Sequence, residues 1–357
     1  MPDRIVSYAA VLPRLSHLKF TTDLEINVVT DELLVHLRDM PSLTTLHLRH
    51  VDSRKGLGSG LAHLIPAAPK VCSLQKLDLL YAHLQPKTLQ YIFRMPRLTS
   101  LSINLSSIST SNMLSVLPRF KELSALRELN VLTDDDEAFL PDGVFRGLPL
   151  TRLLLINFAL AGEGMSSLTS LKELAIENCT QLNDEDNDTS LSFLNQLPEG
   201  LQDLSLERCK TLSDDNLTHL PTTLQSFGLN ECDKITEIGL AAVAQRCPEV
   251  HYVCIVECSE TVASGLAKFT AARTLIAEDC FVNDRDLLSI SEAVSQLETL
   301  WLTGEEVDVD GKTLIDCFGQ KSTTVKMHEG QSILLCSTVC YHSCSVFFSR
   351  QNVVWRR

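Results

Sequence analysis

The amino-acid sequence predicts an α/β solenoid, a curved horseshoe with a parallel β-sheet on its concave face and helices or irregular turns on its convex face. Two observations predict this fold. A short apolar pattern recurs about twelve or thirteen times along the 357 residues, at intervals of 21 to 31 residues, and the stretches between its copies carry helical spacing. Because one such unit cannot bury its own apolar side, stacking of the units has to supply the core.

This pattern divides the chain into three parts. Residues 1–14 precede the first copy and are predicted to be an N-terminal cap or the remnant of a preceding unit. Residues 15–330 are predicted to form the repeat domain, and residues 331–357 an irregular, apolar, cysteine-containing tail. A repeat array accounts for the length of the middle part, since each unit packs only on its neighbours.

The recurring pattern is Leu-x-x-Leu-x-Leu, and we number its first leucine position 1 of each unit. Complete copies begin at Leu43, Leu74, Leu150, Leu201 and Leu297. Conservative or degraded copies begin at Leu15, Leu98, Leu126, Leu171, Leu224, Val250, Ala272 and, as a thirteenth unit, Ser322. Side chains alternate along a strand, so positions 4 and 6 are predicted to point into the solenoid and positions 3, 5 and 7 to its concave side.

Segments between the strands show helical spacing behind capping residues. Apolar residues three and four apart follow Asp31, Thr236 and Asp284. Side-chain oxygens of Asp and Thr accept hydrogen bonds from the free N–H groups of a first helical turn, so these three residues are the predicted N-caps. Residues 308–311 are predicted to be a turn and helix cap for a helix over 312–318.

Five cysteines follow the same register. Position 9 is occupied by Cys179, Cys209, Cys232, Cys258 and Cys280. The chain turns away from the strand at this position, where a small buried side chain can bond the backbone of the loop. Thiols that are one unit apart do not converge on one tetrahedral site, so these cysteines are predicted to be structural rather than metal-binding or redox-active.

These features resemble the leucine-rich repeat family over about residues 15–327. The cysteine units, about 171–280, resemble the cysteine-containing subclass found in F-box/leucine-rich repeat substrate receptors, and the stretch 231–240, followed by Cys247-Pro248, matches that unit closely. Earlier units carry Val51, Ala82, Ser106, Asp134 and Phe158 at position 9. The resemblance implies a leucine-rich repeat solenoid whose concave face binds a protein and, for the subclass, substrate recognition in a ubiquitin-ligase assembly.

The composition argues against several other classes of function. The formal net charge of −14 and the pI of about 5.2 imply repulsion of phosphate backbones, so nucleic acid is not the expected partner. The N-terminal residues lack the apolar core of a secretory signal, and no apolar run reaches the length of a membrane span. We therefore expect a cytoplasmic or nuclear protein that does not insert into a membrane.

No motif predicts catalysis, a cofactor or a metal. The carboxylates within 184–188 alternate like the start of an EF-hand loop, but Thr189 stands where that loop requires glycine and Asn195 where it requires its closing glutamate. The glycines within 56–60 have their lysine on the wrong side for a phosphate-binding loop. We therefore expect a protein without catalytic residues, cofactor or metal.

The concave positions change character along the chain, from basic through acidic to apolar and aromatic. The predicted partner-binding residues are His47, Arg49, Glu128, Glu173, Glu177, Asp203, Glu207, Tyr252, Ile276 and Trp301. A partner with a basic segment for the acidic middle and an apolar group for Trp301 would suit such a face. Trp301 is either an interface anchor or a residue that the C-terminal segment covers.

The tail leaves several interpretations open. Cys336, Cys340 and Cys344 have helical spacing within an apolar stretch. A capping helix, a palmitoylated or tail-anchored segment and a stretch outside the repeat frame all fit this pattern, and capping or an irregular tail is the preferred interpretation.

The predicted function is a non-catalytic scaffold that binds a protein partner on its concave face. The competing hypothesis is a regulator of an enzyme such as a small GTPase, or a host-directed effector. Residues 197–201 and 220–224 resemble the Leu-Pro-x-x-Leu units of such effectors. The oligomeric state cannot be predicted from these patterns.

Overall fold

The computed structural model confirms the predicted repeat solenoid. It describes residues 14–20, 42–48, 60–65, 72–80, 84–134, 138–140, 144–160, 165–181, 192–259, 261–304, 307–319 and 321–328, together with Leu34, Leu37, Met40 and Ala82. Residues 1–13 of the predicted cap (1–14), the acidic run 184–188, the predicted N-cap Asp31, Arg49 and the tail at 331–357 lie outside the described residues.

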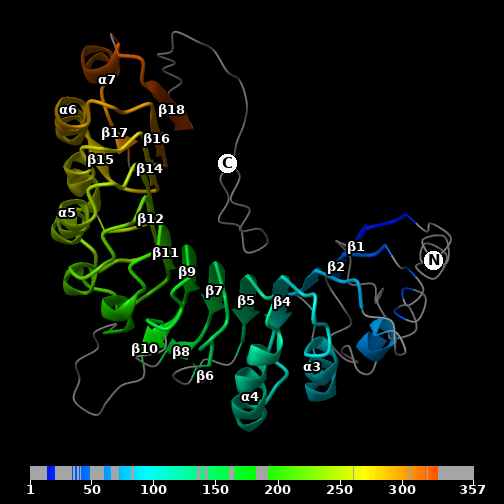
Figure 1. The fold of residues 1–357 in the computed structure, drawn as a ribbon. Coiled ribbons are helices and arrows are strands. Elements are labelled where there is room, and N and C mark those ends of the chain that lie inside the picture. The colour runs from blue at the N-terminus through cyan, green and yellow to red at the C-terminus, as the bar shows by residue number, and fades with distance from the viewer. Residues whose placement is uncertain are drawn as a thin grey trace.

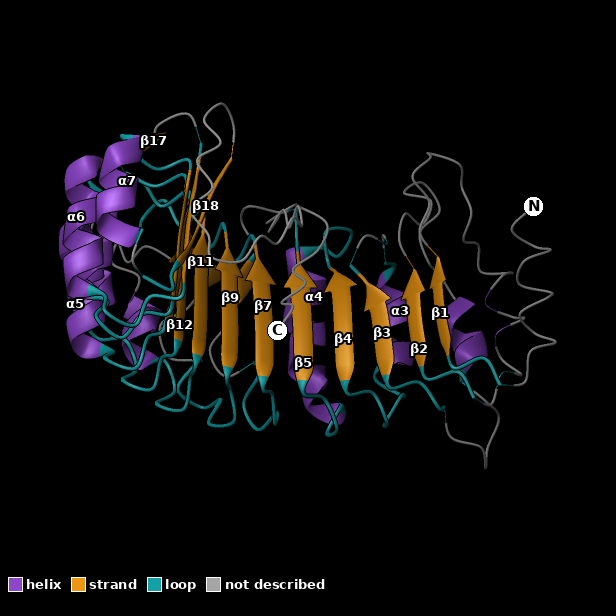
Figure 2. Ribbon diagram, turned by 90° about the horizontal axis from the view of Figure 1, so that it is seen from above, coloured by secondary structure: helices purple, strands orange, loops and turns teal. Residues whose placement is uncertain are grey.

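One parallel sheet of thirteen strands runs the length of the described chain. Its strands lie along the inner side of a curve, and helices α3 to α7 lie on the outer side (Figures 1 and 2). The strands are β1 (His17–Phe20), β2 (Thr45–Leu48), β3 (Lys76–Leu79), β4 (Ser100–Asn104), β5 (Glu128–Leu132), β7 (Arg152–Ile156), β9 (Glu173–Glu177), β11 (Asp203–Glu207), β12 (Ser226–Asn230), β13 (Tyr252–Val256), β14 (Thr274–Glu278), β16 (Thr299–Thr303) and β18 (Thr324–His328). All thirteen copies of the apolar pattern therefore form a strand, including the degraded copies that begin at Ala272 and Ser322.

The register of this sheet is constant. Each residue of a strand pairs with the residue at the same position of the neighbouring unit, as Asp203 does with Glu173 on one side and Ser226 on the other. Positions 4 and 6 point into the solenoid, and there Leu204 and Leu206 have no exposed surface. Burial of these leucines in unit after unit supplies the continuous core that the pattern predicts.

The outer side is less regular than the inner side. Its α-helices are α3 (Pro86–Ile92), α4 (Thr110–Val116), α5 (Glu237–Arg246), α6 (Asp284–Ala293) and α7 (Gly311–Phe318). Short 3-10 helices take their place at Gly60–Leu64, Ser192–Gln196, Asp214–Leu217 and Val262–Lys268, and another, Leu117–Glu122, directly follows α4. Two small parallel sheets, β6 (Phe139–Leu140) with β8 (Ala159–Leu160) and β10 (Thr180–Gln181), and β15 (Val282–Asn283) with β17 (Val307–Asp308), complete the convex layer.

The observed N-cap residues of the helices can be compared with the predicted ones. Thr236 caps α5, since its Oγ1 accepts a hydrogen bond from the Ile238 N–H, and Asp310 caps α7 through the Lys312 N–H. The predicted N-cap Asp284 is wrong by one residue. Asn283 caps α6 and forms a capping box with Asp286, whereas Asp284 is the first helical residue.

Neighbouring units are also joined on the outer side by polar contacts. Asp214 accepts hydrogen bonds from the backbone N–H and the hydroxyl of Thr236 at 2.9 and 2.6 Å, so a side chain of one unit orients the cap of the next helix. Asp284 does the same for the N–H of Asp310 at 2.9 Å. These contacts fix the angle at which each helix follows its predecessor.

Four large apolar side chains on the outer side differ from the simple prediction that apolar helix positions face the core. Ile238, Phe281, Leu288 and Ile315 are 39 to 68% exposed. Leu288 and Ile315 stand five residues after the N-caps of α6 and α7, so they occupy equivalent places on two helices that pack together. The core contact of these helices comes instead from Leu287, Ile290 and Leu314.

Candidate functional site

Positions 3, 5 and 7 of the strands form three columns of side chains on the concave face. The constant register places equal positions side by side, and adjacent strands lie about 4.8 Å apart. Side chains of neighbouring units therefore contact one another along each column.

The first units are not purely basic, because their basic residues have acidic neighbours. His47 on β2 lies 3.1 Å from the Asp78 carboxylate on β3, and Lys76 lies 3.9 Å from Glu128 two strands away. Glu128 thus pairs with a basic residue of the first units and is not part of the acidic group on the later strands. Both pairs are partly exposed, so solvent and salt screen them.

The middle of the face holds a small hollow at positions 3 and 5. Asn130, Arg152, Leu153, Leu154, Glu173, Leu174, Ala175 and Asp203 line it. Its volume of about 40 Å³ is far below the several hundred Å³ of a typical small-molecule site. Arg152 reaches Glu173 at 2.6 Å, which leaves Asp203 without a cation in direct contact in this hollow.

The surroundings of Asp203 in this hollow disfavour its negative charge. Partial burial raises its pKa, and the adjacent Glu173 carboxylate raises it further, while a hydrogen bond from Ser226 acts in the opposite direction. A carboxylate whose charge is disfavoured by burial and by a like charge gains stability from a cation that binds beside it.

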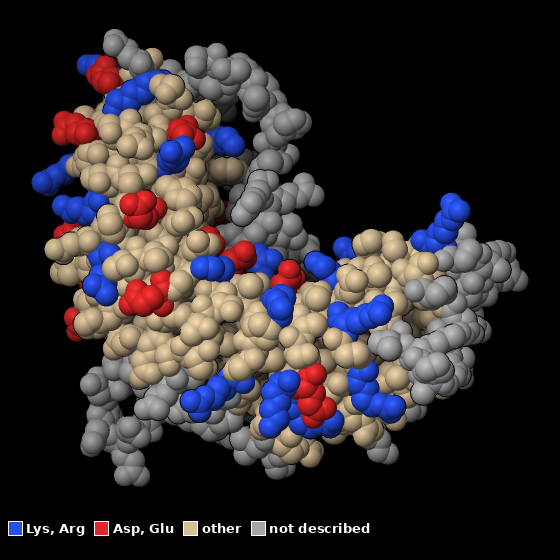
Figure 3. Space-filling model, viewed as in Figure 1, with Lys and Arg blue, Asp and Glu red and all other residues tan. Residues whose placement is uncertain are grey.

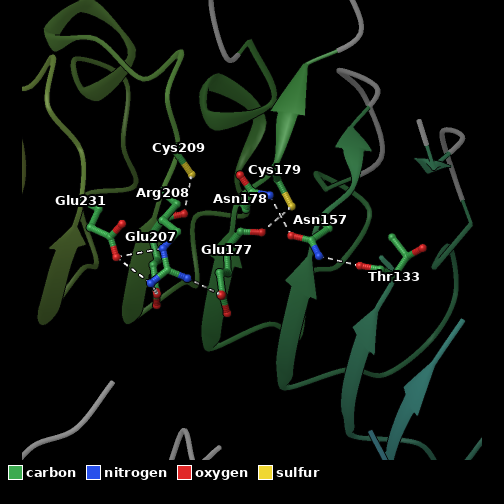
Figure 4. Close-up of polar contacts among 9 residues, drawn as sticks. All are labelled: Thr133, Asn157, Glu177, Asn178, Cys179, Glu207, Arg208, Cys209 and Glu231. Carbon is green, nitrogen blue, oxygen red and sulfur yellow. Dashed lines mark hydrogen bonds and ion pairs between the residues drawn. The ribbon is translucent and has the colours of Figure 1, made fainter. Parts of the chain in front are cut away.

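A second acidic group surrounds Arg208 at the carboxyl ends of β9, β11 and β12 (Figure 4). The Arg208 guanidinium contacts Glu231 at 2.6 Å, Glu177 at 3.1 Å and Glu207 at 3.3 Å. Three carboxylates thus share one cation. Burial, and then the Glu177 charge, raise the pKa of Glu207 to about 7.

Arg208 and Glu231 were missed by sequence reasoning, which treated the concave face as strand positions alone. Both stand at position 8, where six non-glycine residues have φ between 45 and 62°. These six are Asn157, Asn178, Arg208, Glu231, Glu257 and Asp279. The left-handed turn keeps the N–H in line with the sheet, so that it bonds the position 7 carbonyl of the next unit, as the Arg208 N–H does with Asn230 at 2.8 Å.

The side chains at position 8 continue this ladder in the earlier units. The Asn178 amide donates to Asn157 Oδ1 at 2.8 Å, and the Asn157 amide donates to the Thr133 carbonyl (Figure 4). Asn tolerates the left-handed region better than other side chains with a Cβ atom, so its presence was a usable signal. Arg208 and Glu231 carried no such signal.

The left-handed turn at position 8 directs position 9 into the solenoid. Cys179, Cys209, Cys232 and Cys280 are each 1% exposed, while Cys258 is partly exposed. The Cys232 Sγ donates to the Leu206 carbonyl of the preceding unit at 3.5 Å. Burial raises the pKa of these thiols, which opposes formation of a reactive thiolate.

An apolar cluster lies on the concave face of β13, β14 and β16, separate from the main core. Its buried members are Cys254, Val256 and Ile276, and the partly buried Tyr252 and Trp301 pack against them. Ile276 is only 5% exposed, so it supports the aromatic rings and offers little surface of its own. The Lys326 ammonium lies 4.8 Å from the centre of the Trp301 ring and covers one of its faces.

On the side of the molecule that Figure 3 shows, acidic and basic groups are interspersed, with mostly Lys and Arg over the part that holds α3 and α4. Among the described residues, no group of three or more His, Cys, Asp and Glu side chains could hold a metal ion. Within that same part of the chain, no helix has the length and hydropathy of a membrane span.

Comparison with curated proteins gives a partial match. No family model matches the chain. The protein "Antagonist of mitotic exit network protein 1" of Eremothecium gossypii is 32% identical over 102 residues, which are 26% of this chain and 26% of that protein. The match thus spans about a quarter of the relative's length.

Solved structures are similar over most of the chain. A chain of the TLR13–ssRNA13 complex has a TM-score of 0.53 at 18% identity, with 89% of this chain and 47% of that chain covered. The complex of Rad7 and Elc1 in yeast gives 0.47 at 17% identity, with 90% and 83% covered. A leucine-rich repeat protein of Leptospira interrogans gives 0.46 at 13%, with 89% and 85% covered. The first likeness shows a shared fold.

Proposed function

Because the chain has the leucine-rich repeat fold, we propose that it is a non-catalytic scaffold that holds a protein partner against its concave face. One observation carries the proposal. The concave face carries a hollow lined by partly buried carboxylates and, farther along the same sheet, an aromatic cluster that lies outside the core. Aromatic anchors beside charged groups are typical of protein interfaces.

The acidic residues support a protein partner rather than a nucleic acid. Glu173, Asp203, Glu177 and Glu207 all stand on the inner face, where a bound strand would bring its phosphates close to them. The Arg152 and Arg208 charges are each engaged by carboxylates. A phosphate backbone would meet net repulsion on this part of the face.

The finer assignment is substrate recognition in a ubiquitin-ligase assembly, and it rests on the cysteine units. The stretch 231–240, which carries Cys232, resembles the unit found in F-box/leucine-rich repeat substrate receptors. The curated relative is described as an antagonist of a network. A scaffold that binds another protein without transforming it could produce such an effect, so a regulatory role is the second candidate.

The test is affinity capture with the full chain and matched variants. Trp301→Ala removes the aromatic anchor, and the double variant Glu173→Gln, Asp203→Asn removes two concave charges. The double variant Arg97→Gln, Arg146→Gln removes two exposed charges away from the strands and is the control. We expect partners that the wild type and the control retain and that both concave variants lose.

The identity of the captured proteins separates the candidates. Ubiquitin-ligase adaptors would support the receptor assignment, and a GTPase would support the regulator. If all four proteins retain the same partners, the concave face is not the binding surface and the proposal is wrong.

A further inference from the structure

In the acidic part of the concave face, the residues along position 5 are smaller than those along positions 3 and 7, and we call this strip the trough. Its floor is position 5 of β9, β11 and β12, where Ala175, Ser205 and Gly228 have small side chains or none. Its walls are positions 3 and 7, four residues apart along each strand, or about 13 Å.

Acidic groups form both walls of this trough. Glu173 and Asp203 stand at position 3, and Glu177 and Glu207 at position 7. Arg152 engages Glu173 from β7, at one end of the trough, and Arg208 engages Glu177 and Glu207 along the position 7 wall, so both guanidiniums neutralise part of the charge. Glu207 is about half protonated at pH 7 because its pKa is about 7, yet the other three carboxylates alone outnumber the two guanidiniums and leave an excess of negative charge.

A buried polar atom in the same wall lacks a partner. Asn230, at position 7 of β12, is 5% exposed. It hydrogen-bonds the Glu207 carboxyl, yet its Oδ1 atom has no hydrogen-bond partner among the residues that the structure describes. Leaving such an acceptor buried and unbonded is unfavourable, so the atom marks a place where a donor from a ligand would be stabilised.

The trough ends at the apolar cluster. Position 5 continues from Gly228 to Cys254, Ile276 and Trp301, so the floor changes from small to apolar side chains. Trp301 lies four strand spacings from β11, about 19 Å, and Ile276 three, about 14 Å. An extended chain that rises about 3.3 Å per residue covers these distances in four to six residues.

We propose that this trough binds an extended basic peptide segment of a protein partner, with a lysine or arginine between Asp203 and Glu207 and an aromatic or large aliphatic side chain against Trp301, four to six residues away. The inference rests on the proposed function and names the chemistry of the partner. Charge complementarity with the walls selects the basic residue, and the buried Asn230 side chain has to turn outward for its Oδ1 to accept a hydrogen bond from the segment.

The test measures which peptide sequences bind to the full chain. A phage-displayed library of random twelve-residue peptides is selected on the purified protein, and enriched peptides are synthesised with fluorescein for anisotropy titration. We expect enriched sequences to pair Lys or Arg with Phe, Tyr, Trp or Leu at a separation of four to six residues. Enrichment of acidic peptides, or of aromatic peptides without a basic residue, would overturn the proposal.

A variant with a larger side chain on the floor tests whether the peptide binds in the trough or elsewhere on the concave face. Gly228→Val places a branched side chain on the floor, and its Cβ would approach the Ser205 hydroxyl to 3.4 Å and the Cys254 carbonyl oxygen and the Ser205 Cβ to 3.8 Å, so the strand can accept it. We expect about tenfold weaker peptide binding. Ser102→Val makes a matched change at position 5 of β4, outside the trough, and should leave binding within about twofold. Equal effects of the two variants would contradict the proposal.

Other occupants give distinct results. Displacement of the bound peptide by a synthetic peptide of residues 332–348 would assign the trough to the chain's own segment. Tighter binding of a single-stranded RNA oligonucleotide than of the basic peptides would assign it to nucleic acid. Either outcome overturns the inference. If the peptide experiments fail while concave variants still lose a captured protein, the scaffold function stands and only this assignment fails.

Discussion

Glu207 shows how a repeat array perturbs a single residue. Stacking brings Glu177 and Glu231 to the same side of the sheet as Glu207, and one Arg208 guanidinium serves all three. Burial is the larger cause of the raised pKa of Glu207, and the neighbouring charge adds to it. The carboxyl is therefore more easily protonated in the folded chain than in the unfolded one.

This difference predicts a dependence of stability on pH. The unfolded carboxyl titrates near 4.5 and the folded one near 7, so between these values the folded state holds a proton that the unfolded state has released. The free energy of unfolding should therefore fall as the pH rises from about 4.5 to about 7. Glu207→Gln should remove a decrease on the order of 2 kcal/mol, measured by chemical denaturation at pH 5 and pH 8.

Glu292→Gln is the control for that measurement, because Glu292 is an exposed carboxyl on α6. Its stability should follow the wild type at both pH values. A Glu207→Gln variant with the same pH dependence as the wild type would show that Glu207 does not titrate in this range.

At the scale of single residues, the sequence identifies column positions but not their surroundings. The alternation of the strands placed Glu173, Asp203 and Trp301 on the concave side. It could not show that Asn230 is buried with an unbonded oxygen, or that Lys326 covers a face of Trp301, because both depend on contacts between side chains of different units.

The strands and helices differ in how well they could be predicted. Every copy of the apolar pattern forms a strand, because positions 4 and 6 must be buried in each unit for the units to stack. The outer segments vary between units, and some form a 3-10 turn where others form an α-helix, as at Asp214–Leu217. In these outer segments the sequence pattern indicates which residues face the core, but it does not predict whether the segment forms an α-helix or a 3-10 turn.

The cap of α6 gives a prediction at the scale of one element. Asn283 Oδ1 accepts hydrogen bonds from the Arg285 and Asp286 N–H groups at 2.9 and 3.2 Å. Asn283→Ala leaves these donors without that partner and should lower the free energy of unfolding by about 1 kcal/mol, measured by urea denaturation.

Arg285→Ala is the matched control, since Arg285 is an exposed residue of the same first turn. It should change stability by less than about 0.5 kcal/mol. Equal losses for the two variants would mean that the cap hydrogen bonds contribute nothing beyond helix propensity.

The whole molecule is held together by contacts between adjacent units. Strands pair with their sequence neighbours in the large sheet, and α5 packs on the 3-10 helix Val262–Lys268, which packs in turn on α6. Gly265 permits this close approach, because a Cβ there would lie 2.7 Å from the Leu240 Cβ. Stability should therefore be transmitted along the array from unit to unit.

A cavity in one unit tests that transmission. Leu204 has no exposed surface, so Leu204→Ala should lower the free energy of unfolding by about 2 to 5 kcal/mol. Amide hydrogen exchange should rise most in the units that begin at Leu171, Leu201 and Leu224, and much less in the unit that begins at Leu98, four units away.

The exposed Lys210→Ala is the control for that experiment and should leave exchange unchanged. A uniform rise of exchange over all units would show instead that the array opens as one cooperative body.

The constant register of the thirteen strands also bears on how such a protein can evolve. Each position of a strand pairs with the same position of the next strand. A recombination event that duplicates or deletes one whole unit therefore leaves every remaining interface of the same kind. The trough could in this way gain or lose one strand spacing without a new fold. A lineage could lengthen or shorten the peptide that it recognises by exchanging units, and alter its charge by changing single residues at positions 3 and 7.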